Sequence, residues 1–288
     1  MTLEAKNVNV LDETAAAASE SVCESAVQEK TAEEKTAEAL FGKEPLAGEG
    51  EEAVLETKNL VKDYGKGIGL LGVDLRLPKG KIIGLLGTNG SGKTTLLKLI
   101  AGILTPTAGE LTVCGSKIGV ETKKAVSYLP ERTYLNDWMK VEDIIEYFED
   151  FYEDFSAEKA YAMLNSLDVD PKRKLKTLSK GTKEKVQLVL VMARNAQLYL
   201  LDEPIAGVDP VAREFILDTI VSNYNKGATV LVSTHLITDV EKVLDSFIFV
   251  RNGKVIMQGD VAKAREVYGG KTLDEIFREV YKRCSQNA

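Results

Sequence analysis

A glycine-rich loop that follows an apolar run constrains the fold of this chain more than any other feature. Residues 87–95 read Gly-Thr-Asn-Gly-Ser-Gly-Lys-Thr-Thr and fit the pattern G-x-x-x-x-G-K-[ST]. Residues 81–86 are almost wholly apolar, as in a strand buried on both faces, and apolar residues continue through 93–101 at helical spacing. A strand, a loop and a helix in this order indicate an α/β domain built on a parallel sheet.

The same loop predicts a ligand. Its glycines let backbone N–H groups approach a polyphosphate, and the helix that begins near Lys93 points its positive end at the same anion. Lys93 can reach the β- and γ-phosphates, and the Thr94 hydroxyl can ligate Mg²⁺. The predicted nucleotide-binding residues of the loop are Gly87, Asn89, Gly90, Ser91, Gly92, Lys93, Thr94 and Thr95.

An acidic pair closes a second apolar run, residues 198–201. Asp202 stands at the carboxyl end of this predicted parallel strand, where the ligand crevice of such a sheet lies, so we expect it to hold Mg²⁺. The adjacent Glu203 can orient and deprotonate an attacking water. Without the glycine-rich loop, a solvated acidic turn before Pro204 would explain the pair equally well.

Strands and helices alternate along most of the chain, which indicates a parallel sheet covered on both faces. The predicted strands span residues 54–64, 70–77, 81–86, 125–129, 197–201 and 228–233. The predicted helices span residues 93–101, 141–151, 157–167, 180–193, 211–223 and 237–244. The dipeptide Asn252-Gly253 predicts a hairpin between strands at 247–251 and 254–258. We expect the main domain to span 53–260, with a helical subdomain inserted at about 132–178 and a helical segment at 261–288.

Residues 1–52 are predicted to form a separate acidic extension. Residues 1–53 carry 13 acidic and 4 basic side chains, so most of the net charge of −7 belongs to this segment. A segment of this composition buries too little apolar area to offset its conformational entropy, which favours a disordered, solvated tail over a partner-docking arm. The remainder is nearly neutral, so we expect no nucleic-acid partner.

Composition places the chain among ordinary soluble proteins. No stretch approaches 18 consecutive apolar residues, and the first ten residues show no secretory signal, so we expect a cytoplasmic protein without a membrane span. The three cysteines, Cys23, Cys114 and Cys284, are few and far apart, which argues against a disulfide framework or a cysteine metal site.

Four further fragments follow the loop in a fixed order: residues 178–182, 200–204, 206–209 and 233–235. With them, residues 53–258 resemble the nucleotide-binding subunit of an ATP-binding-cassette (ABC) transporter. The resemblance implies a RecA-like P-loop core, a small antiparallel β subdomain and an inserted α-helical subdomain. It also implies that two such domains clamp two ATP molecules, each bound by the phosphate loop of one and the signature loop of the other.

The resemblance assigns roles outside the phosphate loop. Tyr64 matches the aromatic that stacks on adenine, although a strand-end core tyrosine is the alternative. Ser179 and Gly181 match the signature residues that contact the γ-phosphate across the dimer, and Ser179 is also a good helix N-cap. Asp209 matches the loop that links the two sites. His235, the only histidine of the chain, matches the switch histidine that contacts the γ-phosphate.

The chain departs from the family pattern at three positions. The usual signature Leu-Ser-Gly-Gly-Gln carries Lys180 in place of the first glycine and Thr182 in place of the glutamine. Glu131 stands where a glutamine usually helps to hold Mg²⁺, and its carboxylate can still approach the metal. These variants resemble the bacterial antibiotic-resistance and export-type branch, and they place the efficiency of the composite site in question.

The sequence therefore predicts an ATP hydrolase subunit that powers a separately encoded membrane permease from the inner face of the membrane. The expected catalytic residues are Glu203, His235 and Lys93, and the expected Mg²⁺ ligands are Thr94, Asp202 and Glu131. Two alternatives remain: an ABC ATPase without a transport role, and the weakly hydrolysing half of a heterodimeric pair. A P-loop kinase or GTPase fits poorly, because neither needs the signature segment or the later histidine.

Overall fold

The structure is a computed structural model that describes residues 45–48, 50–65 and 67–286. The predicted extension at 1–52 therefore lies mostly outside the described residues. Its last part already contacts the folded body, because Ala47 is buried and its N–H donates to the carbonyl oxygen of Arg76 at 3.0 Å. The folded body thus begins before Ala53.

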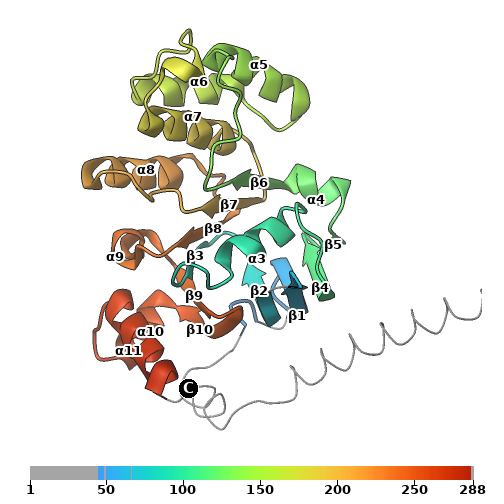
Figure 1. Cartoon of the computed structure of the whole chain (residues 1–288), viewed down its shortest axis with the longest axis vertical. Coiled ribbons are helices and arrows are strands. Elements are labelled where there is room, and N and C mark those ends of the chain that lie inside the picture. The colour runs from blue at the N-terminus through green and yellow to red at the C-terminus, as the bar shows by residue number, and fades with distance from the viewer. Residues whose placement is uncertain (1–44, 49, 66, 287–288) are drawn as a thin grey trace, which may run out of the picture.

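Among the described residues, six strands form a sheet in the order β10-β9-β3-β8-β7-β6 (Figure 1). Neighbouring strands run parallel from β9 to β6, and β10 pairs antiparallel with β9. The strands are β3 (Ile82–Leu86), β6 (Val126–Leu129), β7 (Leu198–Asp202), β8 (Thr229–Thr234), β9 (Ser246–Arg251) and β10 (Lys254–Asp260). The carboxyl ends of β3, β7 and β8 therefore meet at one edge, where we expected the phosphate loop and the acidic pair.

Alternating side chains of the sheet divide the interior into two cores. Ile83 and Leu85 of β3 lie in one core, and Ile82 and Leu86 lie in the other. The first core is completed by α3 (Lys93–Ile100) and an antiparallel sheet, the second by helices. This alternation explains why the strand is apolar at every position but its single glycine.

The antiparallel sheet has the strand order β2-β1-β4-β5 and lies beside α3 (Figure 1). Its strands are β1 (Ala53–Asp63), β2 (Ile68–Pro78), β4 (Ala108–Val113) and β5 (Ser116–Lys117). The sequence predicted β1 and β2 but missed β4, β5 and the short helix α4 (Val120–Ala125). Only two residues of β4 are buried, so its period-two apolar pattern is weak.

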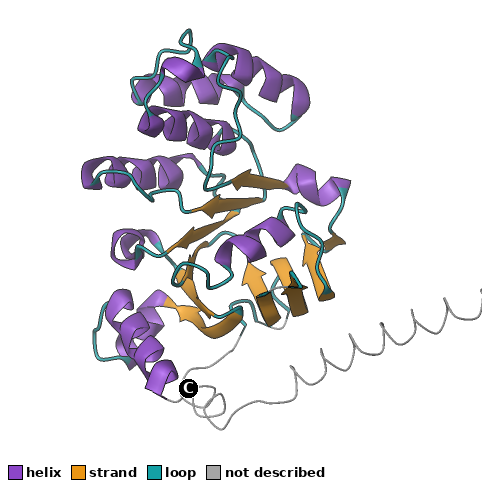
Figure 2. Ribbon diagram, in the orientation of Figure 1, coloured by secondary structure: helices purple, strands orange, loops and turns teal. Residues whose placement is uncertain are grey.

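Three helices gather at the end of the molecule away from the antiparallel sheet (Figure 2). They are α5 (Val141–Phe151), α6 (Ala157–Ser166) and α7 (Lys180–Met192), and a short 3₁₀ turn at Leu175–Thr177 precedes α7. The first two confirm the predicted helices inserted after β6. The third, α7, packs on α5 and α6 and also on β6 and α8 (Pro210–Asn223), so it joins the helical subdomain to the sheet.

The C-terminal part follows the predicted hairpin. Asn252 and Gly253 both have positive φ, 48° and 76°, as the two-residue hairpin turn requires. Helix α9 (Ile237–Val240) and a 3₁₀ turn at Glu241–Val243 replace the single helix expected at 237–244. After β10 the chain forms α10 (Val261–Val267) and α11 (Leu273–Gln286). None of the helices in the described part of the chain is long and apolar enough to span a membrane.

Candidate nucleotide-binding site

The phosphate loop joins β3 to α3, and two of its glycines are required by close backbone contacts. A Cβ added at Gly87 would overlap the carbonyl oxygen of Val250. Gly92 has a φ of 108°, and a Cβ there would lie 2.5 Å from the carbonyl oxygen of Gly69. Only glycine fits both positions, and the loop is consequently fixed against β9 and β2.

Lys93 lies inside this loop with its side chain only 5% exposed. Its Nζ donates to the carbonyl oxygens of Gly87 at 2.8 Å and Thr88 at 3.2 Å, and lies 3.5 Å from Oε1 of Glu203. Burial lowers the pKa of Lys93, and the neighbouring carboxylate of Glu203 opposes that shift. An ammonium held mainly by two carbonyl oxygens is favourably placed to bind an incoming phosphate.

Asp202 ends β7 and is buried beside the first turn of α3. Its Oδ1 accepts hydrogen bonds from Thr94 Oγ1 at 3.1 Å and Ser233 Oγ at 3.0 Å. Among the described residues its Oδ2 is buried without a hydrogen-bond partner, and burial raises the pKa of Asp202. A buried carboxylate oxygen in this position can accept a hydrogen bond from a metal-bound water.

Glu203 follows Asp202 with a φ of 51°, a left-handed conformation that is uncommon outside glycine. Its backbone N–H donates to the carbonyl oxygen of Ser233 at 2.8 Å, which holds the turn. His235 Nδ1 lies 3.0 Å from Glu203 Oε2, and Thr234 Oγ1 donates to the same oxygen at 3.1 Å. The carboxylate is therefore held at the edge of the sheet, with its side chain only 8% exposed.

A cavity of about 730 Å³ lies over these groups and gathers predicted residues from separate segments. Its predicted lining residues are Tyr64, Asn89, Gly90, Ser91, Gly92, Lys93, Thr94, Thr95, Glu131, Glu203 and His235. Tyr64 is 52% exposed at the mouth, and its Oη lies 3.2 Å from Thr95 Oγ1. A half-exposed ring beside the phosphate loop fits stacking on a base better than a place in the core.

The oxygen donors of this site fit Mg²⁺. Thr94, Asp202 and Glu131 offer a hydroxyl and carboxylates, the ligand types that Mg²⁺ prefers. Oδ2 of Asp202, which makes no hydrogen bond within the described part of the chain, fits such a cation or a water bound to it. Among the residues that the structure describes, no three His, Cys, Asp or Glu side chains form a metal cluster, so Mg²⁺ would need phosphate oxygens as well.

Comparison with known proteins connects this site to a family. The sequence profile of the ABC transporter family matches residues 70–206. The uncharacterized ABC transporter ATP-binding protein YhaQ of Bacillus subtilis is 31% identical over 229 residues, which cover 76% of this chain and 76% of that protein. The chain belongs to the ABC transporter ATP-binding family.

Two further relatives of this ABC protein extend the comparison. The lantibiotic transport ATP-binding protein SrtF of Streptococcus pyogenes is 28% identical over 226 residues, covering 78% of this chain and 96% of that protein. A solved ATP-binding subunit of an ABC transporter has a TM-score of 0.72 at 31% identity, covering 79% of this chain and 99% of that one. The predicted family, fold class and resemblance to the bacterial resistance and export branch are confirmed.

Three residues that the resemblance predicts to act between two subunits lie apart from the phosphate-loop cavity of this ABC domain. Ser179, Gly181 and Asp209 are not among the residues that line it. Ser179 Oγ accepts a hydrogen bond from the N–H of Thr182 at 3.2 Å and caps α7, as its position predicted. Asp209 caps α8 in the same way, through the N–H of Ala212 at 3.0 Å. Within one chain these two side chains therefore stabilise helix starts.

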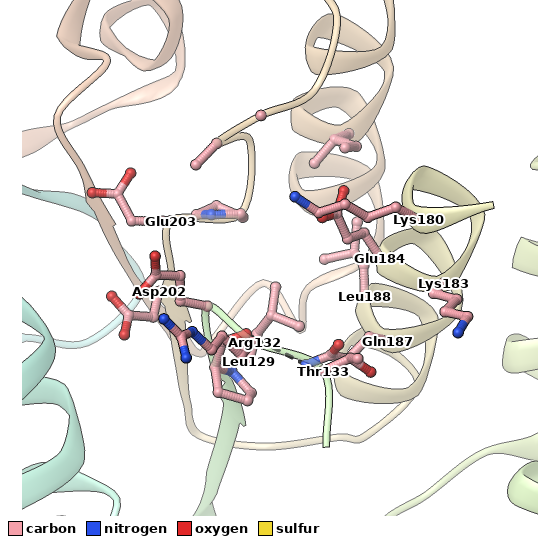
Figure 3. Close-up of a pocket in the computed structure, with 16 residues that line it drawn as sticks. Leu129, Arg132, Thr133, Lys180, Lys183, Glu184, Gln187, Leu188, Asp202 and Glu203 are labelled. Carbon is pink, nitrogen blue, oxygen red and sulfur yellow. Dashed lines mark hydrogen bonds and ion pairs between the residues drawn. The ribbon is translucent and has the colours of Figure 1, made fainter. Parts of the chain in front are cut away.

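A second cavity of the ABC domain, about 470 Å³, separates α7 from the acidic edge of the sheet (Figure 3). Lys180 and Glu184 of α7 line one side, and Asp202 and Glu203 line the opposite side (Figure 3). Glu131 lines this cavity and the phosphate-loop cavity. Two of the three departures from the family pattern, Glu131 and Lys180, therefore line one cavity.

Some residues of the site were not predicted. Ser233 and Thr234 belong to a fragment that the sequence singled out, but their hydrogen bonds to Asp202 and Glu203 follow from strand pairing. Tyr128 of β6 is half-buried near Asp202, and its buried Oη has no hydrogen-bond partner in the described part of the chain. Burial, followed by the Asp202 carboxylate, raises the pKa of Tyr128. Nothing in the sequence indicates that β6 pairs with β7, so the proximity of Tyr128 to Asp202 could not be predicted.

Proposed function

We propose that this chain hydrolyses ATP and thereby powers a membrane permease carried by a separate polypeptide. The observation that carries the proposal is the Glu203 carboxylate. It lies at the edge of the phosphate-loop cavity, 3.5 Å from Lys93 Nζ, and it is held by His235 and Thr234. A positioned carboxylate next to a phosphate-binding cation is what in-line attack of water on a γ-phosphate needs.

Each side chain of the cavity has a role in this proposal. Tyr64 stacks on the adenine, and the backbone N–H groups of the loop hold the β- and γ-phosphates together with Lys93. Thr94, Asp202 and Glu131 would hold Mg²⁺, which when bound neutralises charge on the phosphate oxygens.

Glu203 takes a proton from the attacking water. His235 holds this carboxylate through Nδ1, which leaves Nε2 to face the γ-phosphate. In this proposal His235 contacts both the γ-phosphate and Glu203, so binding of the γ-phosphate affects the position of the general base.

The signature residues complete the site on a second subunit in the proposed mechanism. Ser179 and Gly181 stand at the exposed start of α7, where the positive end of the helix favours an anion. Within the described part of the chain, no hydrogen bond joins them to the phosphate loop. We therefore assign them to the γ-phosphate of ATP that is bound by a second ABC subunit, with Asp209 linking the two sites.

The transport part of the proposal rests on the relatives. Several carry names of transporter ATP-binding proteins, and SrtF is named for lantibiotic transport. A chain of this family would act in the cytoplasm, bound to its permease at the inner face of the membrane. Transport of a lantibiotic-like peptide is the class of transport that SrtF favours.

The experiment that tests hydrolysis compares Glu203→Gln with the wild-type chain in steady-state ATP turnover. We expect turnover to fall by roughly 10²- to 10⁴-fold, the usual effect of removing a general base, while MgATP binding persists. Glu214→Gln is a matched control, because Glu214 is exposed on α8 and pairs with Lys242 at 2.6 Å. Near-wild-type turnover in Glu203→Gln would overturn the assignment.

Transport is tested separately. Glu203→Gln with MgATP should trap the closed state, and we expect a polytopic membrane protein to co-purify with it from native membranes in stoichiometric amount. Recovery of soluble partners alone would favour an ABC ATPase without a transport role. Recovery of a second, different ABC subunit would favour the heterodimer, an arrangement consistent with the altered signature at Lys180 and Thr182.

A further inference from the structure

The C-terminal helix reaches the phosphate loop. Oη of Tyr281 on α11 lies 3.3 Å from Oγ1 of Thr88, the second residue of the loop. The two residues are 193 positions apart in the sequence. Tyr281 also lies outside residues 53–258, the part of the sequence on which the family resemblance rests. The motifs that carry the resemblance therefore assign no role to this contact.

Aromatic packing fixes α11 in this position. The ring of Phe277 meets the ring of Phe249 on β9 edge to face, with centroids 5.0 Å apart, and lies 5.4 Å from the ring of Tyr281. The guanidinium of Arg251 lies 4.4 Å from the centroid of the Tyr281 ring, and its Nη1 donates to the carbonyl oxygen of Tyr281 at 3.4 Å. The phenol is consequently held by both the helix and the end of β9.

The backbone of Thr88 connects this contact to the catalytic lysine. Its carbonyl oxygen accepts hydrogen bonds from the N–H of Ser91 and from Lys93 Nζ, both at 3.2 Å. Holding the Thr88 side chain therefore restrains a carbonyl group that orients Lys93. A loop that is already ordered loses less conformational entropy when it binds a polyphosphate.

We propose that Tyr281 is a positioning residue for the phosphate loop, and that α11 sets the affinity of this site for a nucleoside triphosphate through the Tyr281–Thr88 hydrogen bond. The proposal rests on the nucleotide site described above. Tyr281 touches neither the nucleotide nor the reacting atoms in this scheme; it acts through Thr88 and Lys93. A separation of 3.3 Å makes this a long hydrogen bond, so its effect on affinity is modest.

Two substitutions separate the effect of the Tyr281 hydroxyl from the effect of its ring. Tyr281→Phe removes Oη but keeps the aromatic packing on Phe277 and Arg251, and Thr88→Val removes the partner hydroxyl but keeps the β-branched shape. Tyr147→Phe is the matched control, because Tyr147 is 56% exposed on α5, in the helical subdomain. Dissociation constants for a non-hydrolysable ATP analogue with Mg²⁺ are measured calorimetrically for these variants and for Tyr281→Phe with Thr88→Val.

Each single variant should weaken binding by about two- to tenfold, the affinity equivalent of one hydrogen bond. The double variant should bind the analogue no more weakly than the single variant with the lower affinity, because the two substitutions remove the same hydrogen bond. In turnover assays the ATP concentration for half-maximal rate should rise by the same factor while the maximal rate and the thermal midpoint of Tyr281→Phe stay near wild type.

Two results would overturn the proposal. Tyr281→Phe could bind like wild type and Tyr147→Phe, or the losses from Tyr281→Phe and Thr88→Val could multiply in the double variant. Both outcomes leave the nucleotide site itself intact. A wild-type chain that bound no nucleotide would instead refute the proposed function, so the two failures are distinguishable.

Discussion

The phosphate loop and the signature loop differ in how much the fold of one chain determines them. At Gly87 and Gly92 an added Cβ would meet the backbone of neighbouring strands, and Lys93 is held by two carbonyl oxygens. At Gly181 an added Cβ would meet no other residue within 4 Å, and the backbone there is helical. The phosphate loop is closed by packing, whereas the loop that we propose to complete the site in a second subunit is open.

The two loops contain glycine for different physical reasons. Gly92 is needed because the chain itself leaves no room for a side chain and requires a left-handed backbone. Nothing within the described part of the chain requires a glycine at position 181. If glycine is required at position 181, the requirement comes from a partner that binds this surface. The proposed contact with a second subunit is such a requirement.

The largest effect should come from Gly92→Ala. A Cβ in a backbone with φ of 108° and 2.5 Å from the carbonyl oxygen of Gly69 must displace the loop or β2. We expect nucleotide affinity to fall by roughly 100-fold or more and the thermal midpoint to fall by several degrees. Calorimetry and thermal unfolding measure both quantities. Wild-type affinity would contradict the view that packing dictates this half of the site.

The matched change in the open half, Gly181→Ala, should separate stability from turnover. Alanine favours the first turn of α7, so we expect the chain to gain about 0.5–1 kcal/mol in free energy of unfolding. Nucleotide affinity of the single chain should not change, whereas steady-state turnover should fall by at least about tenfold because the added methyl blocks close approach to a γ-phosphate. Unaltered turnover at full stability would remove Gly181 from the composite site.

Asp202→Asn tests the fit of the closed half to a cation. Burial raises the pKa of Asp202 above its ordinary value of 3.8, so the ionised side chain disfavours folding in the absence of Mg²⁺. This penalty is absent below the unfolded pKa, grows as pH rises toward the folded pKa and is complete above it. In an amide, Oδ1 can still accept from Thr94 and Ser233.

We therefore expect Asp202→Asn to stabilise the metal-free chain by about 1 kcal/mol at pH 7, and by much less below pH 3.8. The same variant should lose most Mg²⁺-dependent turnover. Urea unfolding in the presence of a chelator measures the first effect. A less stable variant at pH 7 would show that the carboxylate serves the fold instead of a cation.

The smallest effect should come from Glu131→Gln, which restores the residue usual in the family. Glu131 is exposed between the two cavities, so removal of its charge should alter Mg²⁺ binding only slightly. We expect the Mg²⁺ concentration for half-maximal turnover to rise by about two- to fivefold, because a neutral amide oxygen attracts the cation less. An unchanged Mg²⁺ dependence would exclude Glu131 from the metal site.

Features encoded in short segments were predictable from the sequence, whereas contacts between distant segments were not. The phosphate loop, the Asp202–Glu203 pair and the hairpin at Asn252 each carry their own pattern, and the structure has them where we expected. β4 pairs with β1 across about 50 residues and has a weak apolar pattern, so this strand could not be predicted.

Contacts between distant segments of the candidate site were equally unpredictable. The hydrogen bond between Tyr281 and Thr88 depends on how α11 packs on β9, and the neighbourhood of Tyr128 and Asp202 depends on strand order. A single sequence reveals neither, because both follow from tertiary contacts between segments that carry no shared motif. The N-cap role of Ser179 could be predicted because this residue directly precedes the helix that it caps.

We propose that one chain carries half a nucleotide site at each of two loops and that a second subunit completes both. Sedimentation of the Glu203→Gln chain with and without saturating MgATP tests it most directly, with the Lys93→Met chain as a control that cannot bind nucleotide. We predict a particle of twice the mass with MgATP, and a single chain without nucleotide or with Lys93→Met. A Glu203→Gln chain that binds MgATP and still sediments as a single chain would contradict the claim for two copies of this protein.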